Sequence, residues 1–331
     1  MENSPDYLTP RHQNRIIRRI EKEYVPISPE THKPETGKPL ALFDHQVRIF
    51  NHVFTPLWFE GEQRERLPYR TVVWSAIKKS GKTAIGGAVS YAWGREYGGE
   101  VLSVANDKDQ ARDRAFNRVL MFVRHMAVQK ARIYNKIVKS ATSDTIVFDD
   151  PHSQLRAIPC DPSGEAGGFQ SLTVWDELWA YSGDLLWRLW TELQPIPNIP
   201  ESIRLVTTYA GYYGESELLF SLYEQACKPD PLSGEYTGEK IPGLEDLPCY
   251  RHGDLFVYWD HEGRMPWHTP EFLESARNDP ANKMRPHEYL RLWENRWTTG
   301  VERFLDMEKV DRAMAIGAEQ GMVNNMPNYY N

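Results

Sequence analysis

Short apolar runs alternate with helical patterns between residues 41 and 210. Each run is a few residues long and rich in Val, Ile, Leu and Trp, which is typical of strands buried on both faces. The segments 81–97 and 107–129 have helical periodicity, the second beginning at Asp107 as its N-cap. Strand followed by helix, repeated, predicts a mostly parallel sheet with helices on both faces. The predicted strands are TVVWSA (71–76), EVLSVAN (100–106), DTIVF (144–148), SLTVWD (171–176) and SIRLVTT (202–208).

The polar and apolar pattern changes on either side of this region. Residues 1–40 are polar, with a basic helical piece and then a stretch containing prolines and threonines, and we interpret them as an arm and linker. Residues 211–300 combine loops rich in Pro and Gly with one strand-like run, DLFVYWD, and two helical segments, which predicts a small lid subdomain. Residues 301–331 hold one helical pattern and end in a polar tail. We therefore expect a core at 41–210, flanked by an arm, a lid and a tail.

Composition limits the classes of protein to consider. The chain has 331 residues and is 40% hydrophobic, which allows about two globular domains. No apolar run approaches the roughly 18–20 residues of a membrane span, and the N-terminus lacks the apolar core of a signal peptide, so we expect a cytosolic protein. Three cysteines without C-x-x-C spacing predict free thiols. The net charge of −7 argues against a generally basic surface but allows a local basic groove for nucleic acid.

The stretch SAIKKSGKTAIGG (75–87) joins a predicted strand to a predicted helix and resembles a phosphate-binding loop. Against the pattern G-x-x-x-x-G-K-[ST], only the first glycine differs, because Ala76 stands there. The pattern needs backbone N–H groups at a helix N-terminus, a lysine that reaches the β and γ oxygens, and a hydroxyl for Mg²⁺. We therefore expect ATP and Mg²⁺ as ligands, and the alternative is an exposed lysine turn. The expected binding residues are Lys79, Ser80, Gly81, Lys82 and Thr83.

Two adjacent acids, Asp176 and Glu177, follow the run SLTVWD. In the second nucleotide motif an aspartate holds Mg²⁺ and the next glutamate orients and deprotonates the attacking water. The carboxyl ends of strands are also where ligands bind in open α/β sheets. Taken alone, such a pair is more often a helix start with favourable negative charge. Together with the phosphate loop it predicts Asp176 as a metal ligand with Thr83, and Glu177 as the catalytic base.

A third polar strand end, RLVTTYAG, places Thr207 and Thr208 after an apolar run. Such a strand end beside a γ-phosphate can sense hydrolysis, and the alternative is a plain strand-to-turn junction.

These segments together resemble the ATPase domain of the large terminase subunit, the DNA-packaging motor of tailed bacteriophages. The likeness covers roughly residues 40–310 and includes LALFDHQVRIFNHVF, SAIKKSGKT, VLSVANDKDQARDRAFNRV, VWDELWAY and TTYAG. It implies a RecA-like P-loop NTPase of the additional-strand, catalytic-glutamate type. It implies that Gln46 reads the adenine edge, and that Thr207 and Thr208 form the coupling motif. The segment Asn106–Ala111 resembles the family's strand-to-helix turn, while a helix N-cap with a solvated face explains it equally.

The chain departs from the family pattern in two places. Lys78 stands where family loops commonly carry an arginine, and lysine cannot make a bidentate phosphate contact. We therefore consider Lys78 as a catalytic residue, assisted by an arginine that a neighbouring subunit supplies in trans. The candidates for that arginine are Arg156 and Arg204. The family usually continues into a nuclease of ribonuclease H-like fold, whose metal ions need clustered carboxylates. After Glu302 only Asp306, Glu308, Asp311 and Glu319 remain, on one predicted helix and a tail with no strands to present them, so we expect no nuclease activity, and a nuclease domain either removed or on a separate chain.

The sequence thus predicts an ATP-hydrolysing motor that moves double-stranded DNA into a procapsid. The implied partners are DNA, a portal protein, the small terminase subunit and further copies in a ring, with a monomer in isolation, in the host cell cytoplasm. The alternatives are a helicase-like ATPase, which needs a second RecA-like domain, a non-hydrolysing nucleotide-binding module, and a P-loop kinase. DNA contacts on a helix at Arg112, Arg114, Arg118 and Arg124 compete with a solvated helix face. The histidines at 252, 261 and 268 have no spacing typical of a zinc site.

Overall fold

The computed structural model describes residues 13–28, 30–105, 114–160, 168–230, 233–278 and 284–299. The elements lie within one compact unit, residues 1–298. Its helices are α1 (Arg15–Glu23), α2 (Asp44–Val53), α3 (Lys82–Glu96), α5 (Ala115–Gln129), α6 (Ala131–Ile137), η2 (Leu178–Ala180), α7 (Asp184–Glu192), α8 (Glu217–Cys227), α9 (Pro270–Asn278) and α10 (Pro286–Trp293). Its strands are β1 (Leu57–Phe59), β2 (Arg64–Arg66), β3 (Thr71–Ser75), β4 (Gly99–Ala105), β5 (Val138–Ala141), β6 (Thr145–Phe148), β7 (Ser153–Pro159), β8 (Gln170–Asp176), β9 (Ile203–Thr208), β10 (Glu239–Lys240), β11 (Cys249–His252) and β12 (Leu255–Trp259).

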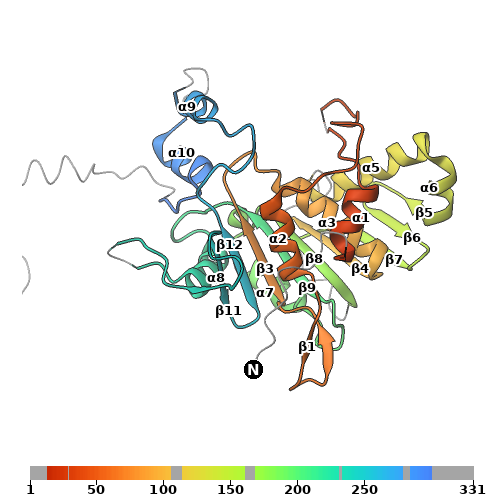
Figure 1. Cartoon of the computed structure of the whole chain (residues 1–331), viewed down its shortest axis with the longest axis horizontal. Helices are drawn as coiled ribbons and strands as arrows, with labels where there is room; N and C mark the ends of the chain where they lie inside the picture. The colour runs from red at the N-terminus through yellow and green to blue at the C-terminus, as the bar shows by residue number, and fades with distance from the viewer. Residues whose placement is uncertain are drawn as a thin grey trace, which may run out of the picture. The chain divides into compact units, whose positions relative to one another are not determined.

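In the described part of the chain, ten strands form one sheet in the order β10-β11-β12-β3-β9-β8-β4-β7-β6-β5 (Figure 1). The strands from β12 to β7 are parallel, and antiparallel hairpins extend both sides of them. Strand β9 lies between β3 and β8. The carboxyl ends of these three parallel strands therefore meet at one edge of the sheet, and the mostly parallel α/β fold expected from the sequence is confirmed.

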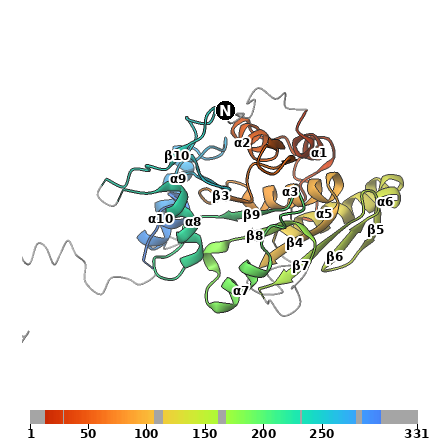
Figure 2. The same ribbon diagram turned by 90° about the horizontal axis from the view of Figure 1, so that it is seen from below.

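Two apolar layers cover the sheet, because successive strand side chains point to opposite faces. Val72 and Trp74 of β3 pack in the layer formed by α1, α2, α3 and α5, whereas Val73 packs in the layer of α7 and α8. Figure 2 shows α3 and α5 on one side of the sheet and α7 on the other. On the first side α3 and α5 approach closely, since a Cβ at Gly87 would lie 2.7 Å from the Cβ of Arg118.

The N-terminal helix is part of this packing, although the sequence suggested an arm over residues 1–40. Ile16, Ile17 and Ile20 of α1 are fully buried within the layer that includes α3. The Oδ1 of Asn14 accepts the backbone N–H groups of Ile16 and Ile17, at 3.0 and 3.1 Å, and caps the helix. The basic residues made this segment look polar, but its isoleucines recur at helical spacing and bury one face.

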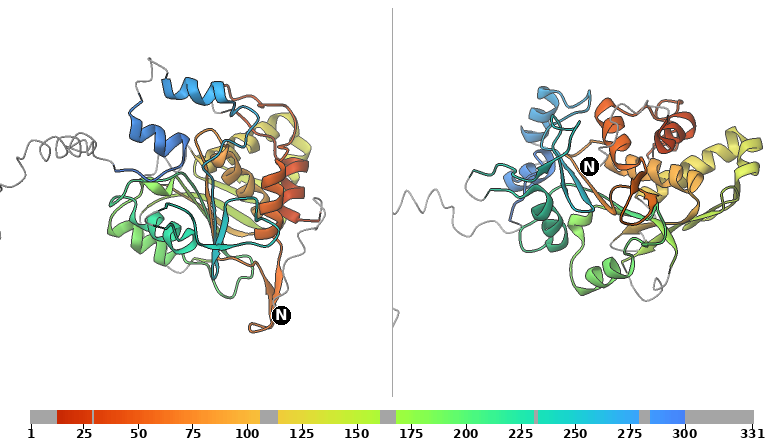
Figure 3. Two further views of the ribbon diagram at one scale, coloured as in Figure 1. Left: turned by 60° about the vertical axis from the view of Figure 1, so that its left-hand side comes forward. Right: turned by 60° about the horizontal axis from the view of Figure 1, so that its bottom comes forward.

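The segment 211–300, expected from the sequence to form a small lid subdomain, contributes strands to the sheet. Its run LFVYW forms β12, which is buried along its whole length and pairs in parallel with β3, with Leu255 opposite Thr71. The pairing crosses a long sequence separation, which a local pattern does not reveal. Helices α9 and α10 follow β12 and lie beyond one end of the strands (Figure 3). No helix among the described residues is both long and apolar enough to cross a membrane.

Candidate nucleotide-binding site

The loop between β3 and α3 has the backbone of a phosphate-binding turn. Lys79 and Gly81 adopt left-handed conformations, with φ of +67° and +74°. A Cβ at Gly81 would meet nothing within 4 Å, so the backbone torsion, and not space, favours glycine there. Helix α3 begins at Lys82 with no acidic residue in its first turn, which leaves its N-terminus positive and suited to an anion.

Lys82 is buried beneath this loop. Its Nζ donates hydrogen bonds to the carbonyl oxygens of Ala76, at 2.8 Å, and Ile77, at 3.0 Å, and lies 4.8 Å from the ring centroid of Tyr209. Burial lowers the pKa of Lys82 to about 8, although Glu177 and Asp176 act in the opposite direction. A buried ammonium group whose hydrogen bonds go to neutral carbonyl groups can bind the negatively charged oxygens of a phosphate strongly.

Asp176 joins three elements at the carboxyl edge of the sheet. This buried residue ends β8, and its Oδ2 accepts the hydroxyl of Thr83 from the first turn of α3 at 3.0 Å. Its Oδ1 accepts the hydroxyl of Thr207 from β9 at 2.7 Å. Burial raises the pKa of Asp176, and the two hydroxyl groups and the nearby charge of Arg114 oppose that shift. One carboxylate and one hydroxyl beside a phosphate loop are a typical protein contribution to Mg²⁺, which takes its other ligands from phosphates and water.

Glu177 directly follows in a left-handed conformation, with φ of +62°. Its N–H donates to the carbonyl oxygen of Thr207 at 2.7 Å, which ties the turn to β9. Its Oε2 accepts the indole N–H of Trp179 at 2.6 Å, and burial raises the pKa of its carboxyl group. Non-glycine residues rarely adopt this torsion unless the surroundings hold them there, and such strain concentrates at functional sites.

Comparisons with known proteins bear on the fold. No family model matches the sequence. No curated protein matches it either. Among solved structures, the crystal structure of the HK97 bacteriophage large terminase is similar, with a TM-score of 0.55 and 16% sequence identity. The chain has a terminase-like fold. The alignment covers 90% of this chain but 57% of that one, and at this identity the likeness shows the fold alone.

The terminase-like fold brings together Lys82, Thr83, Asp176, Glu177 and Thr207. Thr208, the next residue of β9, makes other contacts. Its hydroxyl accepts the backbone N–H of Trp179 at 3.4 Å and donates to the carbonyl oxygen of Tyr209 at 2.9 Å. The hydroxyl of Ser80 donates to the carbonyl oxygen of Ile77 at 2.7 Å and shapes the loop. The backbone N–H of Lys78 donates to Leu292 in α10 at 2.6 Å, so the loop is braced by a distant segment.

Gln46 and the two arginines have other surroundings. Gln46 is buried in the first turn of α2, where its Oε1 accepts the backbone N–H of Phe43 at 3.0 Å. Arg156 lies on β7 and pairs with Glu100 of β4 at 2.7 Å. Arg204, near the start of β9, stacks on Trp190 at 4.0 Å and donates to main-chain carbonyls, and burial lowers its pKa to about 9. Arg204 is therefore a buried structural residue, and the hypothesis that it acts in trans is wrong.

Of the arginines considered for DNA contact, two face the protein. A guanidinium nitrogen of Arg114 lies 3.4 Å from the carbonyl oxygen of Asp176, so this residue borders the nucleotide site. Arg118 bonds to the carbonyl oxygen of Ile27 at 3.3 Å, whereas Arg124 is exposed. Arg112, the segment Asn106–Ala111 and the acids after Glu302 lie outside the described residues.

Asn295 is a site residue that sequence reasoning missed. Its fully buried side chain accepts the hydroxyl of Ser75 at 3.0 Å and the N–H of Ala210 at 2.7 Å, and donates to the carbonyl oxygen of Asp260 at 3.0 Å. One amide thus holds together the chain just where β3, β9 and β12 end. The local sequence WENRW has no motif that would have indicated this role.

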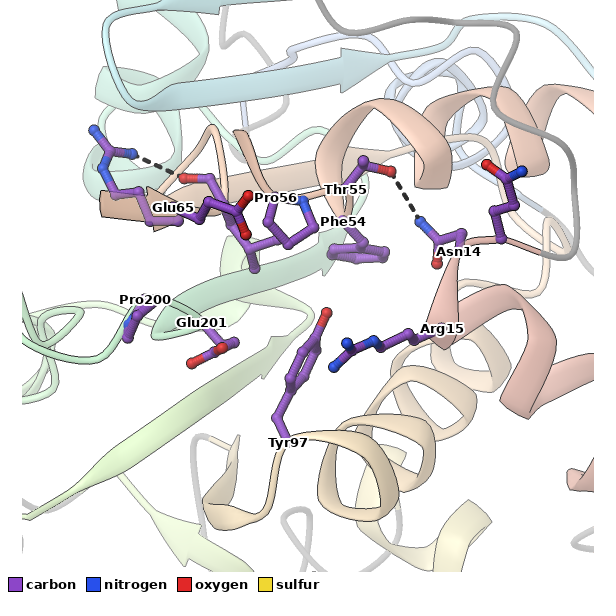
Figure 4. A pocket seen from close by; sticks show the side chains of 12 residues that line it. Asn14, Arg15, Phe54, Thr55, Pro56, Glu65, Tyr97, Pro200 and Glu201 are labelled. Carbon is purple, nitrogen blue, oxygen red and sulfur yellow. Dashed lines mark hydrogen bonds between the residues drawn. The ribbon is translucent and has the colours of Figure 1, made fainter. Parts of the chain in front are cut away.

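A large pocket elsewhere does not have the same chemistry. It measures about 620 Å³ and is lined by residues from before α1, the end of α2, β2 and the loop before β9 (Figure 4). Arg15, Glu65, Tyr97 and Glu201 face it, and no residue of the phosphate loop lines it. Its charges are mixed in sign, and the helix N-terminus in its wall, that of α1, is already capped by the side chain of Asn14, so the nucleotide site is the better functional candidate.

Proposed function

We propose that the chain is the Mg²⁺-dependent ATPase motor of a phage DNA-packaging terminase. One observation carries the proposal: the carboxylate of Asp176 holds the hydroxyl groups of Thr83 and Thr207, with Glu177 next to it and the phosphate loop in front. These residues come from α3, β8 and β9, and the pairing of β9 with both β3 and β8 brings the ends of these elements together. The terminase-like fold supports the choice of motor over other nucleotide-binding proteins.

The residues present fit ATP bound together with Mg²⁺. ATP supplies the phosphoanhydride bond that is hydrolysed. The loop amides and the ammonium group of Lys82 would bind phosphate oxygens, and Thr83 and Asp176 would hold the metal ion, which would neutralise phosphate charge. Glu177 accepts the proton of the attacking water, a role that its burial and raised pKa favour. Thr207 and Thr208 connect this site to β9, so a change at the metal ligand reaches the sheet.

The partners and the setting belong to the same proposal. We place double-stranded DNA, a portal protein and a small terminase subunit as partners, with several copies in a ring on a procapsid in the host cytoplasm. The HK97 large terminase, whose fold this chain shares, supports this choice, although the chain spans only 57% of the length of that protein. A motor grips phosphates without reading bases, so its DNA contacts leave no linear motif.

The decisive experiment compares ATP hydrolysis by the wild-type chain and by Glu177→Gln across protein concentrations, with and without double-stranded DNA. We expect turnover that rises more than linearly with concentration and falls by roughly 10²–10⁴-fold in the variant, because general base catalysis is lost. Glu192→Gln, at an exposed position in α7, is the matched control and keeps wild-type turnover.

The other outcomes identify the alternatives. Equal turnover in wild type and Glu177→Gln would remove the catalytic role of this residue. ATP binding without hydrolysis at any concentration would favour a non-hydrolysing nucleotide-binding module. Hydrolysis that is linear in concentration and that single-stranded DNA stimulates would favour a helicase-like ATPase.

A further inference from the structure

Arg291 is a buried arginine in α10 that none of the motifs explains. Its side chain is only 5% exposed. The guanidinium carbon lies 4.0 Å from the ring of Trp179, 4.6 Å from that of Tyr212 and 5.0 Å from that of Tyr209. Its Nη2 pairs with Glu288 at 2.8 Å, and Tyr212 also donates to that carboxylate. The aromatic faces stabilise the positive charge from three sides.

The hydrogen-bond donors of Arg291 are only partly used. Its Nε and Nη1 atoms are buried and have no hydrogen-bond partner among the described residues. A guanidinium group has five N–H donors in a planar fork, and leaving charged donors unpaired in the interior is costly. The phenol groups of Tyr209 and Tyr212 also interact with the guanidinium group, and Arg291 opposes the rise that burial causes in the pKa of each tyrosine, but Nε and Nη1 remain unpaired. The arrangement therefore suits an anion that brings its own oxygens.

Three contacts place Arg291 beside the nucleotide site. Trp179, on which it stacks, donates its indole N–H to Glu177. The Tyr209 ring contacts both Arg291 and the ammonium group of Lys82, so the two cations lie within reach of one tyrosine. The residue after Arg291, Leu292, accepts the backbone N–H of Lys78 in the phosphate loop. Arg291 thus borders the catalytic acid, the loop lysine and the loop backbone.

We propose that Arg291 binds the terminal phosphate of ATP from within the same chain. The inference rests on the proposed nucleotide site and goes beyond it by assigning a new ligand-binding residue. The planar guanidinium group of Arg291 offers its free Nε and Nη1 donors, on two of its edges, to phosphate oxygens in fixed directions, which the point charge of Lys78 in the loop cannot do. ADP lacks that phosphate, so Arg291 distinguishes the two nucleotides, and α10 reports which one is bound.

Calorimetric titration of the whole chain with Mg²⁺ and either ADP or a non-hydrolysable ATP analogue tests the proposal. Arg291→Met keeps the apolar contacts with the three rings but removes the fork. We expect its affinity for the ATP analogue to fall by about tenfold or more, which a lost charged hydrogen bond accounts for, while its affinity for ADP changes less than about twofold. Arg291→Lys keeps the charge without the fork, and we expect an intermediate loss confined to the ATP analogue.

The matched control is Arg204→Met, which removes an equally buried arginine from an equally close stack on Trp190. We expect it to leave both affinities unchanged. Thermal melts check each variant, and Arg291→Lys carries the test if Arg291→Met does not fold. Equal losses for both nucleotides, or no loss, overturn the proposal and assign Arg291 to packing. If the wild-type chain binds neither nucleotide, the proposed function fails and this inference fails with it.

Discussion

Asp176 shows how individual residues gain a function from neighbours that are distant in sequence. Its carboxylate is almost inaccessible to solvent and is satisfied by two hydroxyl groups, of Thr83 and Thr207. Hydroxyl groups donate without adding charge, so the carboxylate keeps negative charge available for a cation. Replacing either threonine by valine would remove one of the two hydrogen bonds that the Asp176 carboxylate accepts, in an interior that already raises the pKa of this residue. The threonines therefore position the acid and sustain its charged form.

At the same scale, the burial of Lys82 predicts proton uptake on nucleotide binding. Its pKa of about 8 means that it is largely neutral at about pH 9, and a phosphate favours the charged form. We expect ADP or ATP binding to take up close to one proton at about pH 9 and little at about pH 7, with affinity falling as pH rises above 8 by up to about tenfold per unit. Calorimetry in buffers of different ionisation enthalpy measures this uptake.

Lys130→Gln removes an exposed lysine and should leave the uptake intact. Because the pKa of Lys82 is lower in the folded protein than the ordinary 10.5, the unfolded chain binds more protons between pH 8 and 10.5. Lys82 therefore makes the folded state more stable as pH rises through that window. Binding without proton uptake at high pH would mean that Lys82 stays charged in the free protein.

At the scale of elements, the strands that carry the site could be predicted because their signal is local. β3, β4, β8 and β9 each contain two or three adjacent apolar residues, and β8 and β9 are buried along their whole length. Strand β7, SQLRAIP, was missed because its polar residues interrupt the apolar pattern. For the same reason the phosphate loop and the acid pair were accessible to sequence reasoning. Asn295 and Arg291 were not, since their roles depend on a returning segment.

Asn295 gives a prediction for the way the strand ends are held. In Asn295→Ala the N–H of Ala210 and the carbonyl of Asp260 lose their buried partner, and the hydroxyl of Ser75 loses its acceptor. We expect the free energy of unfolding to fall by about 2–4 kcal/mol, as for several buried polar groups left unpaired. Urea unfolding measures the loss.

Two further observations make this test specific. Asn278→Ala, at an exposed position near the end of α9, should change stability little. Nucleotide affinity should fall in Asn295→Ala at temperatures where the variant is still folded, because β3 leads into the phosphate loop. A loss below about 1 kcal/mol would show that water replaces the amide and that the strand ends do not depend on it.

At the scale of the whole molecule, the residues around the nucleotide divide into two groups. Lys82, Glu177 and Arg291 converge on one edge of the sheet within a single chain. Arg156 lies on β7, which β4 separates from the acid strand β8, and it pairs with Glu100. If Arg156 contributes to hydrolysis, it therefore does so in the nucleotide site of a neighbouring subunit. Heterologous ring interfaces make this possible, since each subunit presents one surface to the next.

Mixing variants separates these two groups. Arg156→Ala leaves its own site intact, and Glu177→Gln keeps Arg156, so an equal mixture in a ring should regain about a quarter of wild-type hydrolysis if subunits assort at random. Arg291→Met mixed with Glu177→Gln should regain nothing, because both residues serve the same site from the same chain. The measurement is steady-state ATP turnover with double-stranded DNA, each variant alone serving as the baseline.

Recovery in the second mixture would mean that Arg291 acts across a subunit interface. Without recovery in the first mixture, Arg156 would have no role in trans, and it would be a structural residue paired with Glu100.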